Sequence, residues 1–147
     1  ETLILTKSET KQIPKSIFFN ERPLSENSHY KITSQPTYLS QILFNIIINA
    51  AQSIKEKSPN MLSKESIAIH IFDEQDNTQI HIRDTGLGIP EAYCNRIFTP
   101  FFTTKDRGTG LGLSICRELA KKIDAEVAFC RNTPDCGTTF ILKIPKA

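Results

Sequence analysis

Long hydrophobic runs and strong charge blocks are both missing from this chain of 147 residues. The longest apolar run, Ile46 to Ile48, is far too short to span a bilayer, and nothing resembles a signal peptide. The formal net charge is only +2, and the basic residues are scattered along the chain. The sequence therefore lacks the features of a membrane-spanning segment and the basic patch of a nucleic-acid-binding protein, and we expect no nucleic-acid partner.

Cysteine pairs with metal-binding spacing are missing as well. The four cysteines (Cys94, Cys116, Cys130 and Cys136) form no C-x-x-C motif and have no nearby histidines. This excludes the usual zinc motifs and indicates reduced thiols in a cytoplasmic domain. Two nucleotide-binding motifs are also absent. A P-loop is excluded, because no glycine in the chain is followed by Lys-Ser or Lys-Thr. A Rossmann dinucleotide-binding motif is excluded too, because no G-x-G pair continues to G-x-G-x-x-G.

The length, the apolar fraction of 39% and the mixed charges are typical of one globular domain. Because the chain begins with Glu1 rather than methionine, we expect it to be a piece of a longer protein. Residues 1–147 are then one domain, with residues 1–12 as a remnant of a connector.

Hydrophobic periodicity predicts an α+β fold. A long helix is expected from Pro36 to just before Pro59, and a second one over residues 111–123. Period-two alternation and turn signals predict strands over residues 13–21, 29–33, 66–72, 78–83, 126–131 and 138–144. Residues 91–97 are expected to form a short helical turn. We expect a two-layer sandwich, in which a mixed, mainly antiparallel sheet of about five strands is covered by helices on one face.

A glycine-rich stretch, FTPFFTTKDRGTGLGLSI, covers residues 98–115. It contains two basic residues and three alternating glycines just before the second helix: Lys105, Arg107, Gly108, Gly110 and Gly112. Glycine lets the backbone approach a ligand closely, and a helix N-terminus offers unpaired N–H groups to an anion. A flexible surface loop before a helix cap is the alternative, but the coincidence of all three features favours a phosphate site.

The first long helix carries a polar stripe in which Asn45 and Asn49 lie one turn apart. The flanking Phe44 and Ile48 make the helix apolar nearly all round, which predicts that it is buried. A buried amide that finds no hydrogen-bond partner costs about 1–3 kcal/mol. Two interpretations stay open: the amides satisfy neighbouring backbone groups, or they line a polar cavity where an amide oxygen joins a Mg²⁺ shell.

The turn DTGLGIP begins at Asp84, directly after a predicted strand. An aspartate before Thr-Gly usually caps such a turn through its own side chain, and the residues alone favour this interpretation. In the alternative, the carboxylate accepts a hydrogen bond from an exocyclic amine such as that of adenine, and Gly86 and Gly88 leave room for the base.

Taken together, these stretches resemble the ATP-binding domain of sensor histidine kinases, relatives of gyrase, Hsp90 and MutL. In chain order, NIIINA is similar to the N box, DTGLGIP to the G1 box, RIFTPFFTTK to the F box, GTGLGLSI to the G2 box and CGTTF to the last glycine–threonine motif. The similar region spans residues 36–145. The resemblance implies a sheet-and-helix sandwich in which ATP lies between the helices and a mobile lid.

The resemblance also implies roles for individual residues. Asn49 would be the Mg²⁺ ligand, Asn45 would face the phosphates, and Lys105 would be the lid cation near the terminal phosphate. These three would form the catalytic set. Asp84 would hold the adenine amino group, with Thr138 nearby. The other implied nucleotide contacts are Gly86, Gly88, Phe101, Thr104, Gly108, Thr109, Gly110, Leu111 and Gly112.

Three departures from the family pattern stand out. Ile123-Asp124-Ala125 replaces a His-Gly-Gly turn, Asp135-Cys136-Gly137 replaces the usual Gly-x-Gly before Thr138, and Thr99 replaces a glutamate. None touches the Mg²⁺ ligand or the adenine carboxylate, so we expect a competent site. Phe101 and Phe102 are expected to anchor the lid rather than to stack on the base. The lid, residues 103–110, is expected to be disordered or variable without nucleotide.

A phosphoacceptor is absent, since His29, His70 and His81 lie on or beside predicted strands. The resemblance therefore implies the cytoplasmic ATP-binding domain of a kinase whose substrate histidine lies on a dimerisation module outside this sequence. A response regulator would be its further partner. We expect the isolated domain to be a monomer and the full-length protein a homodimer. The alternative is a nucleotide-dependent regulatory module, like anti-sigma relatives or degenerate kinases.

Asn45 also bears on the expected reaction. In gyrase, Hsp90 and MutL, a glutamate four residues before the magnesium asparagine activates water for hydrolysis. An amide has no useful basicity near neutral pH, and general-base assistance contributes roughly 10²–10⁴-fold to such steps. We therefore expect slow hydrolysis of ATP by the domain alone.

Overall fold

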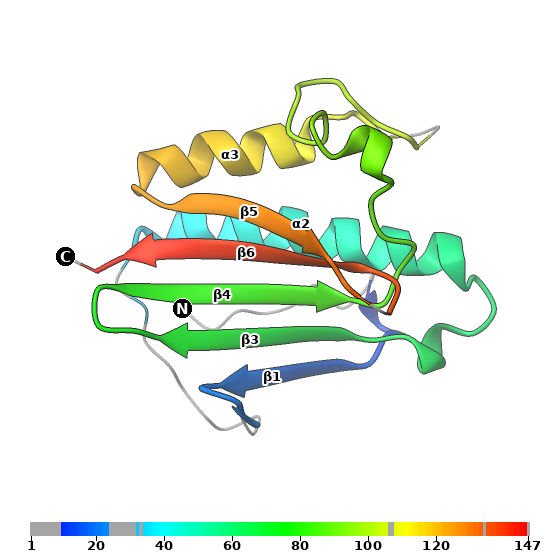
Figure 1. Cartoon of the computed structure of the whole chain (residues 1–147), viewed down its shortest axis with the longest axis horizontal. Coiled ribbons are helices and arrows are strands. Elements are labelled where there is room, and N and C mark those ends of the chain that lie inside the picture. Colours follow the sequence, from blue (N-terminus) through cyan, green and yellow to red (C-terminus); the bar gives the residue numbers. More distant parts are fainter. Residues whose placement is uncertain (1–9, 24–31, 33, 106–107, 134, 147) are drawn as a thin grey trace.

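A computed structural model describes residues 10–23, 32, 34–105, 108–133 and 135–146. Six strands form one sheet in the order β2-β1-β3-β4-β6-β5 (Figure 1). Their bounds are Lys15–Phe19 for β1, Arg22–Pro23 for β2, Ile67–Asp73 for β3, Asn77–Asp84 for β4, Glu126–Arg131 for β5 and Thr138–Pro145 for β6. β1 runs parallel to β3, and the other neighbouring pairs are antiparallel.

The mixed, mainly antiparallel sheet is confirmed, and it has six strands where about five were expected. The additional strand, β2, has only two residues, which is too short for a period-two pattern to reveal it. The predicted strand over residues 13–21 is also shorter, because Asn20 and Glu21 adopt positive φ angles of 43° and 66° and turn the chain into β2. Most of the strand predicted at residues 29–33, all but residue 32, and most of the connector at 1–12 lie outside the described residues.

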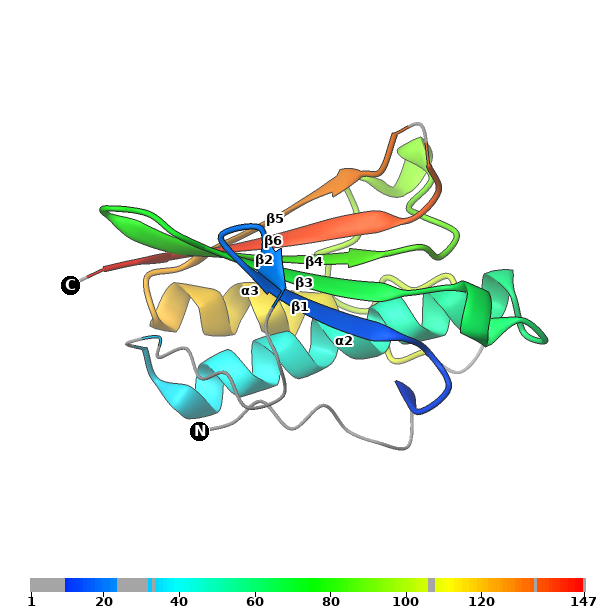
Figure 2. The same cartoon turned by 90° about the horizontal axis from the view of Figure 1, so that it is seen from below.

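Two helices, α2 (Pro36–Lys57) and α3 (Gly112–Lys122), cover one face of the sheet (Figure 2). Pro36 occupies the first turn of α2, where its missing N–H costs nothing, and Pro59 follows the helix end. Two short 3₁₀ helices, η1 (Leu62–Lys64) and η2 (Glu91–Tyr93), lie in the connections. The predicted helices and the helical turn after residue 90 are confirmed. Within the described part of the chain, no helix is long and apolar enough to cross a membrane.

The core lies between the helices and the covered face of the sheet. Ile42, Ile46 and Ile54 of α2 are completely buried. They face the inward side chains of the central strands, which alternate with outward ones as the pleat requires. Each full burial of such a side chain stabilises the fold by about 1.5–3 kcal/mol.

The expectation that α2 is buried nearly all round was wrong. Phe44 is 46% exposed, and Asn45, Ile48 and Asn49 are only partly buried. α2 packs against the sheet on one side and against α3 on another, and no other described helix or strand covers its third side. The two asparagines therefore lie at an accessible edge of the helix.

Candidate functional site

Alternation along β4 explains why Asp84 is buried. Thr78, Ile80, Ile82 and Asp84 all face the helices, so the carboxylate takes the last inward position of the strand. β6 begins with the same pattern, and Thr138 takes its first inward position. Since Arg83 pairs with Thr139 across the two strands, Asp84 and Thr138 lie next to each other.

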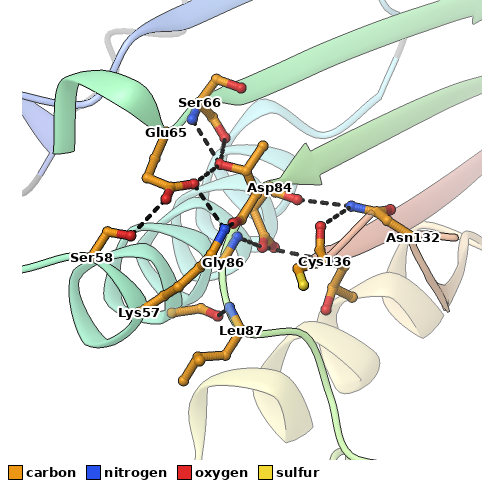
Figure 3. Close-up of polar contacts among 12 residues, drawn as sticks. Lys57, Ser58, Glu65, Ser66, Asp84, Gly86, Leu87, Asn132 and Cys136 are labelled. Carbon is orange, nitrogen blue, oxygen red and sulfur yellow. Dashed lines mark hydrogen bonds and ion pairs between the residues drawn. The ribbon is translucent and has the colours of Figure 1, made fainter. Parts of the chain in front are cut away.

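The two oxygens of the Asp84 carboxylate have different surroundings (Figure 3). Oδ1 accepts hydrogen bonds from the backbone N–H groups of Gly86 at 2.8 Å and Thr138 at 3.3 Å. Oδ2 has no hydrogen-bond partner among the residues that the structure describes. The side chain is therefore the turn cap that the residues alone favour, and it still offers a second oxygen to a ligand.

Burial raises the pKa of Asp84 to about 6, because a charged carboxylate loses hydration inside the protein. The hydrogen bonds from Gly86 and Thr138, and the positive charge of Lys57, act in the opposite direction. The residue is only 2% exposed. A hydrogen-bond donor that pairs with Oδ2 would relieve part of this desolvation.

The turn after Asp84 packs directly on α2. A Cβ atom at Gly86 would lie 2.3 Å from Ser53 Oγ, so only glycine fits there. Ser53 Oγ in turn accepts a hydrogen bond from the backbone N–H of Leu87 at 3.0 Å. Beyond the turn, a Cβ on Gly88 would lie 3.2 Å from the carbonyl oxygen of Gly137. These contacts fix the turn between α2 and the loop that precedes β6.

Asn132 holds the loop that carries the altered glycine motif. Its Nδ2 donates to the carbonyl oxygens of Asp84 at 2.8 Å and Cys136 at 3.4 Å, and its Oδ1 accepts from Thr139 Oγ1 at 2.7 Å. Gly137 has a φ of +103°, and a Cβ there would lie 2.0 Å from the carbonyl oxygen of Asp84. Asn132 belongs to none of the predicted motifs, although an asparagine directly after a strand is a common turn residue.

On the other side of the site, Lys105 lies against the first long helix. Its Nζ donates to Asn49 Oδ1 at 3.2 Å and to Gln52 Oε1 at 2.5 Å. Partial burial lowers the pKa of Lys105, and the negative charge of Glu56 opposes that shift. A Cβ on Gly112 would make ordinary contact with Asn49 Nδ2 at 3.9 Å. Asn49 is thus brought together with Lys105 and Gly112, which lie far from it in the sequence.

Asn45, one turn earlier on α2, lies beside the Cys116 thiol of α3. Cys116 is fully buried, and its Sγ donates to the carbonyl oxygen of Ile42 at 3.6 Å. Burial raises the pKa of this thiol to about 11, and the interaction with Asn45 opposes that rise. The thiol is therefore protonated and structural.

The two phenylalanines of the lid have different roles. Phe102 packs on the core, with its ring 5.5 Å from that of Tyr93 and the Arg96 guanidinium 4.6 Å above it. Phe101 is 76% exposed, so the expectation that both anchor the lid was wrong for Phe101. Its φ of 67° brings its backbone against Gly110, where a Cβ atom would lie 2.4 Å away.

The N-terminus of α3 is open. Leu111, the residue before the helix, makes no side-chain cap, and the first turn contains no acidic residue. Thr109 Oγ1 accepts a hydrogen bond from the Leu111 N–H at 3.3 Å, while Thr104, Gly108 and Thr109 are exposed. The first N–H groups of an α-helix have no partner within the helix and favour an anion. Residues 106–107 of the predicted lid lie outside the described residues.

Two of the three histidines lie on the open face of the sheet, as expected. His70 of β3 stacks on Phe18 with ring centroids 4.5 Å apart, and His81 of β4 meets the edge of Phe72 at 4.9 Å. Burial lowers the pKa of both. His29 lies outside the described residues.

Residues 34–147 match the model of the family described as histidine kinase-, DNA gyrase B- and HSP90-like ATPase. The chain belongs to this ATPase family. Sporulation kinase A of Bacillus subtilis is 31% identical to this ATPase domain over 121 residues, and the signal transduction histidine-protein kinase AtoS of Escherichia coli is 35% identical over 121 residues. Each alignment covers 82% of the domain and 19% of the relative.

The structural comparison agrees with the sequence comparison. The catalytic domain of histidine kinase ThkA, in a nucleotide-free form, superposes on this ATPase domain with a TM-score of 0.71 and 29% sequence identity. The match covers 95% of the domain and 83% of the ThkA chain. The fold is therefore that of histidine kinase catalytic domains, and membership of the family makes this a nucleotide-binding domain.

Proposed function

We propose that this domain binds Mg²⁺ and ATP and transfers the γ-phosphate to a histidine on a dimerisation module outside this sequence. The observation that best supports this is the Asp84 carboxylate, which is buried at a strand end and keeps Oδ2 without a partner among the described residues. The proposal extends to a homodimeric sensor with a response regulator as its downstream partner, and to a cytoplasmic position for this domain.

Adenine is the base that suits Asp84. Its 6-amino group can donate to Oδ2, whereas guanine presents a carbonyl oxygen at that position and would face the carboxylate with a second acceptor. A buried polar mismatch of this kind is strongly discriminating. Gly86 and Thr138, which donate to the carboxylate, and Gly88, which packs on Gly137, would shape the base pocket.

The residues on α2 fit a cation that accompanies the phosphates. Asn49 Oδ1 accepts from the Lys105 ammonium, so its amide oxygen is already aimed at a positive charge. We assign Asn49 as the Mg²⁺ ligand, since Mg²⁺ takes only one or two protein ligands besides phosphates and waters. When bound, Mg²⁺ would neutralise phosphate charge. Lys105 would then turn to the terminal phosphate. The nucleotide contacts would continue through Asn45, Phe101, Thr104, Gly108, Thr109, Gly110, Leu111 and Gly112.

The reaction needs no base from this domain. An imidazole nitrogen of the partner module would attack the γ-phosphorus, the bond to the ADP oxygen would break, and the imidazole proton would pass to solvent. Lys105 and the N-terminal N–H groups of α3 would stabilise the transferred charge by position alone. Asn45 stands where water-activating relatives carry glutamate, and its amide can only orient a water molecule. ATP would therefore persist until a histidine arrives.

Incubation with γ-labelled ATP tests this function. The domain alone should release phosphate slowly and retain no label, whereas adding its own histidine-bearing module, in the same chain or in trans, should produce acid-labile phosphate on that module. Asp84→Asn should abolish labelling, and Glu118→Gln, an exposed residue of α3, should not. Brisk phosphate release by the domain alone would indicate an ATPase instead. ATP binding without any labelling of the module would support the regulatory alternative.

A further inference from the structure

A second carboxylate, Glu65, is buried close to the proposed base site and belongs to none of the nucleotide motifs. It lies between η1 and β3 and is 9% exposed. Its Oε1 accepts from Ser58 Oγ at 2.6 Å, and its Oε2 accepts from Thr85 Oγ1 at 2.6 Å and Lys57 Nζ at 3.2 Å (Figure 3). The hydrogen bonds from Ser58 and then Thr85 are the main causes that lower the pKa of Glu65. The buried charge is therefore fully compensated.

Thr85, the partner of Glu65, is the residue that follows Asp84. Its Oγ1 accepts from the Ser66 N–H at 2.9 Å, and its own N–H donates to the carbonyl oxygen of Ser66 at 3.2 Å. Lys57 Nζ donates to the carbonyl oxygen of Thr85 at 2.7 Å. The side chain and the backbone of Thr85 are thus both held in place. Lys57, which binds its carbonyl oxygen, also binds Glu65, and Ser66, which binds its N–H and its hydroxyl, follows Glu65 in the chain.

The cluster of Lys57, Glu65 and Thr85 secures the turn at Thr85. Asp84 itself is held through its carbonyl oxygen by Asn132, on the opposite side of the turn. Its carboxylate makes hydrogen bonds within the described structure only through Oδ1. The direction of Oδ2 therefore depends on how the backbone around Asp84 and Thr85 is oriented.

We propose that Glu65 is a positioning residue, which acts through Thr85 to aim the Asp84 carboxylate at the exocyclic amine of adenine. This inference rests on the proposed function of Asp84. A hydrogen bond weakens steeply when its angle or distance departs from the preferred range. Small rotations of the turn would therefore reduce recognition of the amine without removing the rest of the nucleotide site.

The test compares ATP with purine riboside triphosphate, which lacks only the 6-amino group. The dissociation constant for purine riboside triphosphate divided by that for ATP isolates the bond to Asp84. Glu65→Gln, which keeps the size of the side chain but removes its charge, should lower this ratio about three- to tenfold, in the range found for residues of one hydrogen-bond network. The affinity for purine riboside triphosphate itself should change less than about twofold, because its other contacts are untouched.

Three further variants control for a general loss of structure. Glu74→Gln removes a carboxylate at the other end of β3, where it is exposed and accepts from Gln79, and should leave the ratio unchanged. Thr85→Val should lower the ratio, and Thr85→Ser, which keeps the hydroxyl, should restore it. If Glu65→Gln does not fold, the comparison of Thr85→Val with Thr85→Ser still tests whether the contact between Glu65 and Thr85 orients Asp84. The double variant Glu65→Gln/Thr85→Val should lower the ratio no further than either change alone.

Two results would overturn the inference, and they are distinguishable. Wild-type protein that binds both nucleotides equally would remove the assignment of Asp84, and the proposed base site with it. Wild-type discrimination that persists unchanged in Glu65→Gln, Thr85→Val and Thr85→Ser, even with a lower melting temperature, would leave Asp84 in place. It would show that Glu65 only stabilises the fold.

Discussion

Replacing Asp84 with asparagine should stabilise the domain at neutral pH while it weakens nucleotide binding. Burial raises the pKa of Asp84 from 3.8 to about 6, so the folded state holds this proton more tightly than the unfolded state. Each tenfold difference in proton affinity corresponds to about 1.4 kcal/mol, so charging the buried carboxyl at pH 7.5 costs the folded domain about 3 kcal/mol. Asparagine avoids this cost and keeps one oxygen to accept from Gly86 and Thr138.

The pH dependence separates this charge effect from other consequences of the substitution. The cost is fully present above the folded pKa of about 6 and disappears as the pH falls toward 3.8, because the carboxyl becomes protonated in the folded state. By pH 5, about 1.4 kcal/mol of it has been relieved. Asparagine does not titrate. The stability advantage of Asp84→Asn should therefore shrink by about 1.4 kcal/mol between pH 7.5 and pH 5.

Urea unfolding at pH 7.5, 6 and 5 measures this change. Circular dichroism is the suitable signal, since the chain contains no tryptophan. Ile82→Val, an apolar substitution on the same strand that adds or removes no charge, should cost about 0.5–1.5 kcal/mol at every pH. A difference between wild type and Asp84→Asn that is the same at all three pH values would refute the reasoning.

Four other substitutions test the site. Gly137→Ala should lower the free energy of unfolding by more than about 2 kcal/mol, because its Cβ would lie 2.0 Å from the Asp84 carbonyl oxygen at a φ of +103°. Gly112→Ala, whose Cβ would meet only Asn49 Nδ2 at 3.9 Å, should unfold at the same or a higher urea concentration. Lys105→Ala should weaken binding of ATP about tenfold more than binding of ADP in calorimetry, since it removes a charged contact to the terminal phosphate. Asn49→Ala should bind ATP with an affinity that no longer responds to Mg²⁺, and a retained response would exclude Asn49 as the ligand.

Local patterns were sufficient to predict most of the fold. The prolines at positions 36 and 59 bound α2, and the alternation of Ile80, Ile82 and Asp84 puts the carboxylate on the covered face. Hydrophobic periodicity did not predict β2, which is too short to show a period. It also did not predict which side of α2 is exposed, because apolar residues lie nearly all round that helix. Phe44 was expected to be buried, yet it is 46% exposed, and none of the described helices and strands covers that side of α2.

The sequence motifs predicted the principal residues of the candidate site, but not the hydrogen bonds that hold those residues in place. Asp84, Asn49 and Lys105 stand in recognisable stretches, whereas the contact of Glu65 with Thr85 joins residues 20 positions apart, and that of Asn132 with Asp84 spans 48 positions. Neither spacing follows a helical or strand period. Only the tertiary fold, which brings the ends of α2, β4 and β5 together, creates these hydrogen bonds.

Calorimetric titration of the domain with ATP and GTP, with and without Mg²⁺, tests the central claim most directly. ATP should bind in a Mg²⁺-dependent manner. If Asp84 accepts a hydrogen bond from the exocyclic amine of adenine, GTP should bind at least about 100-fold more weakly, because guanine leaves the buried carboxylate facing an acceptor. Asp84→Asn should remove most of that preference. Equal affinities of the wild-type domain for ATP and GTP would contradict the account.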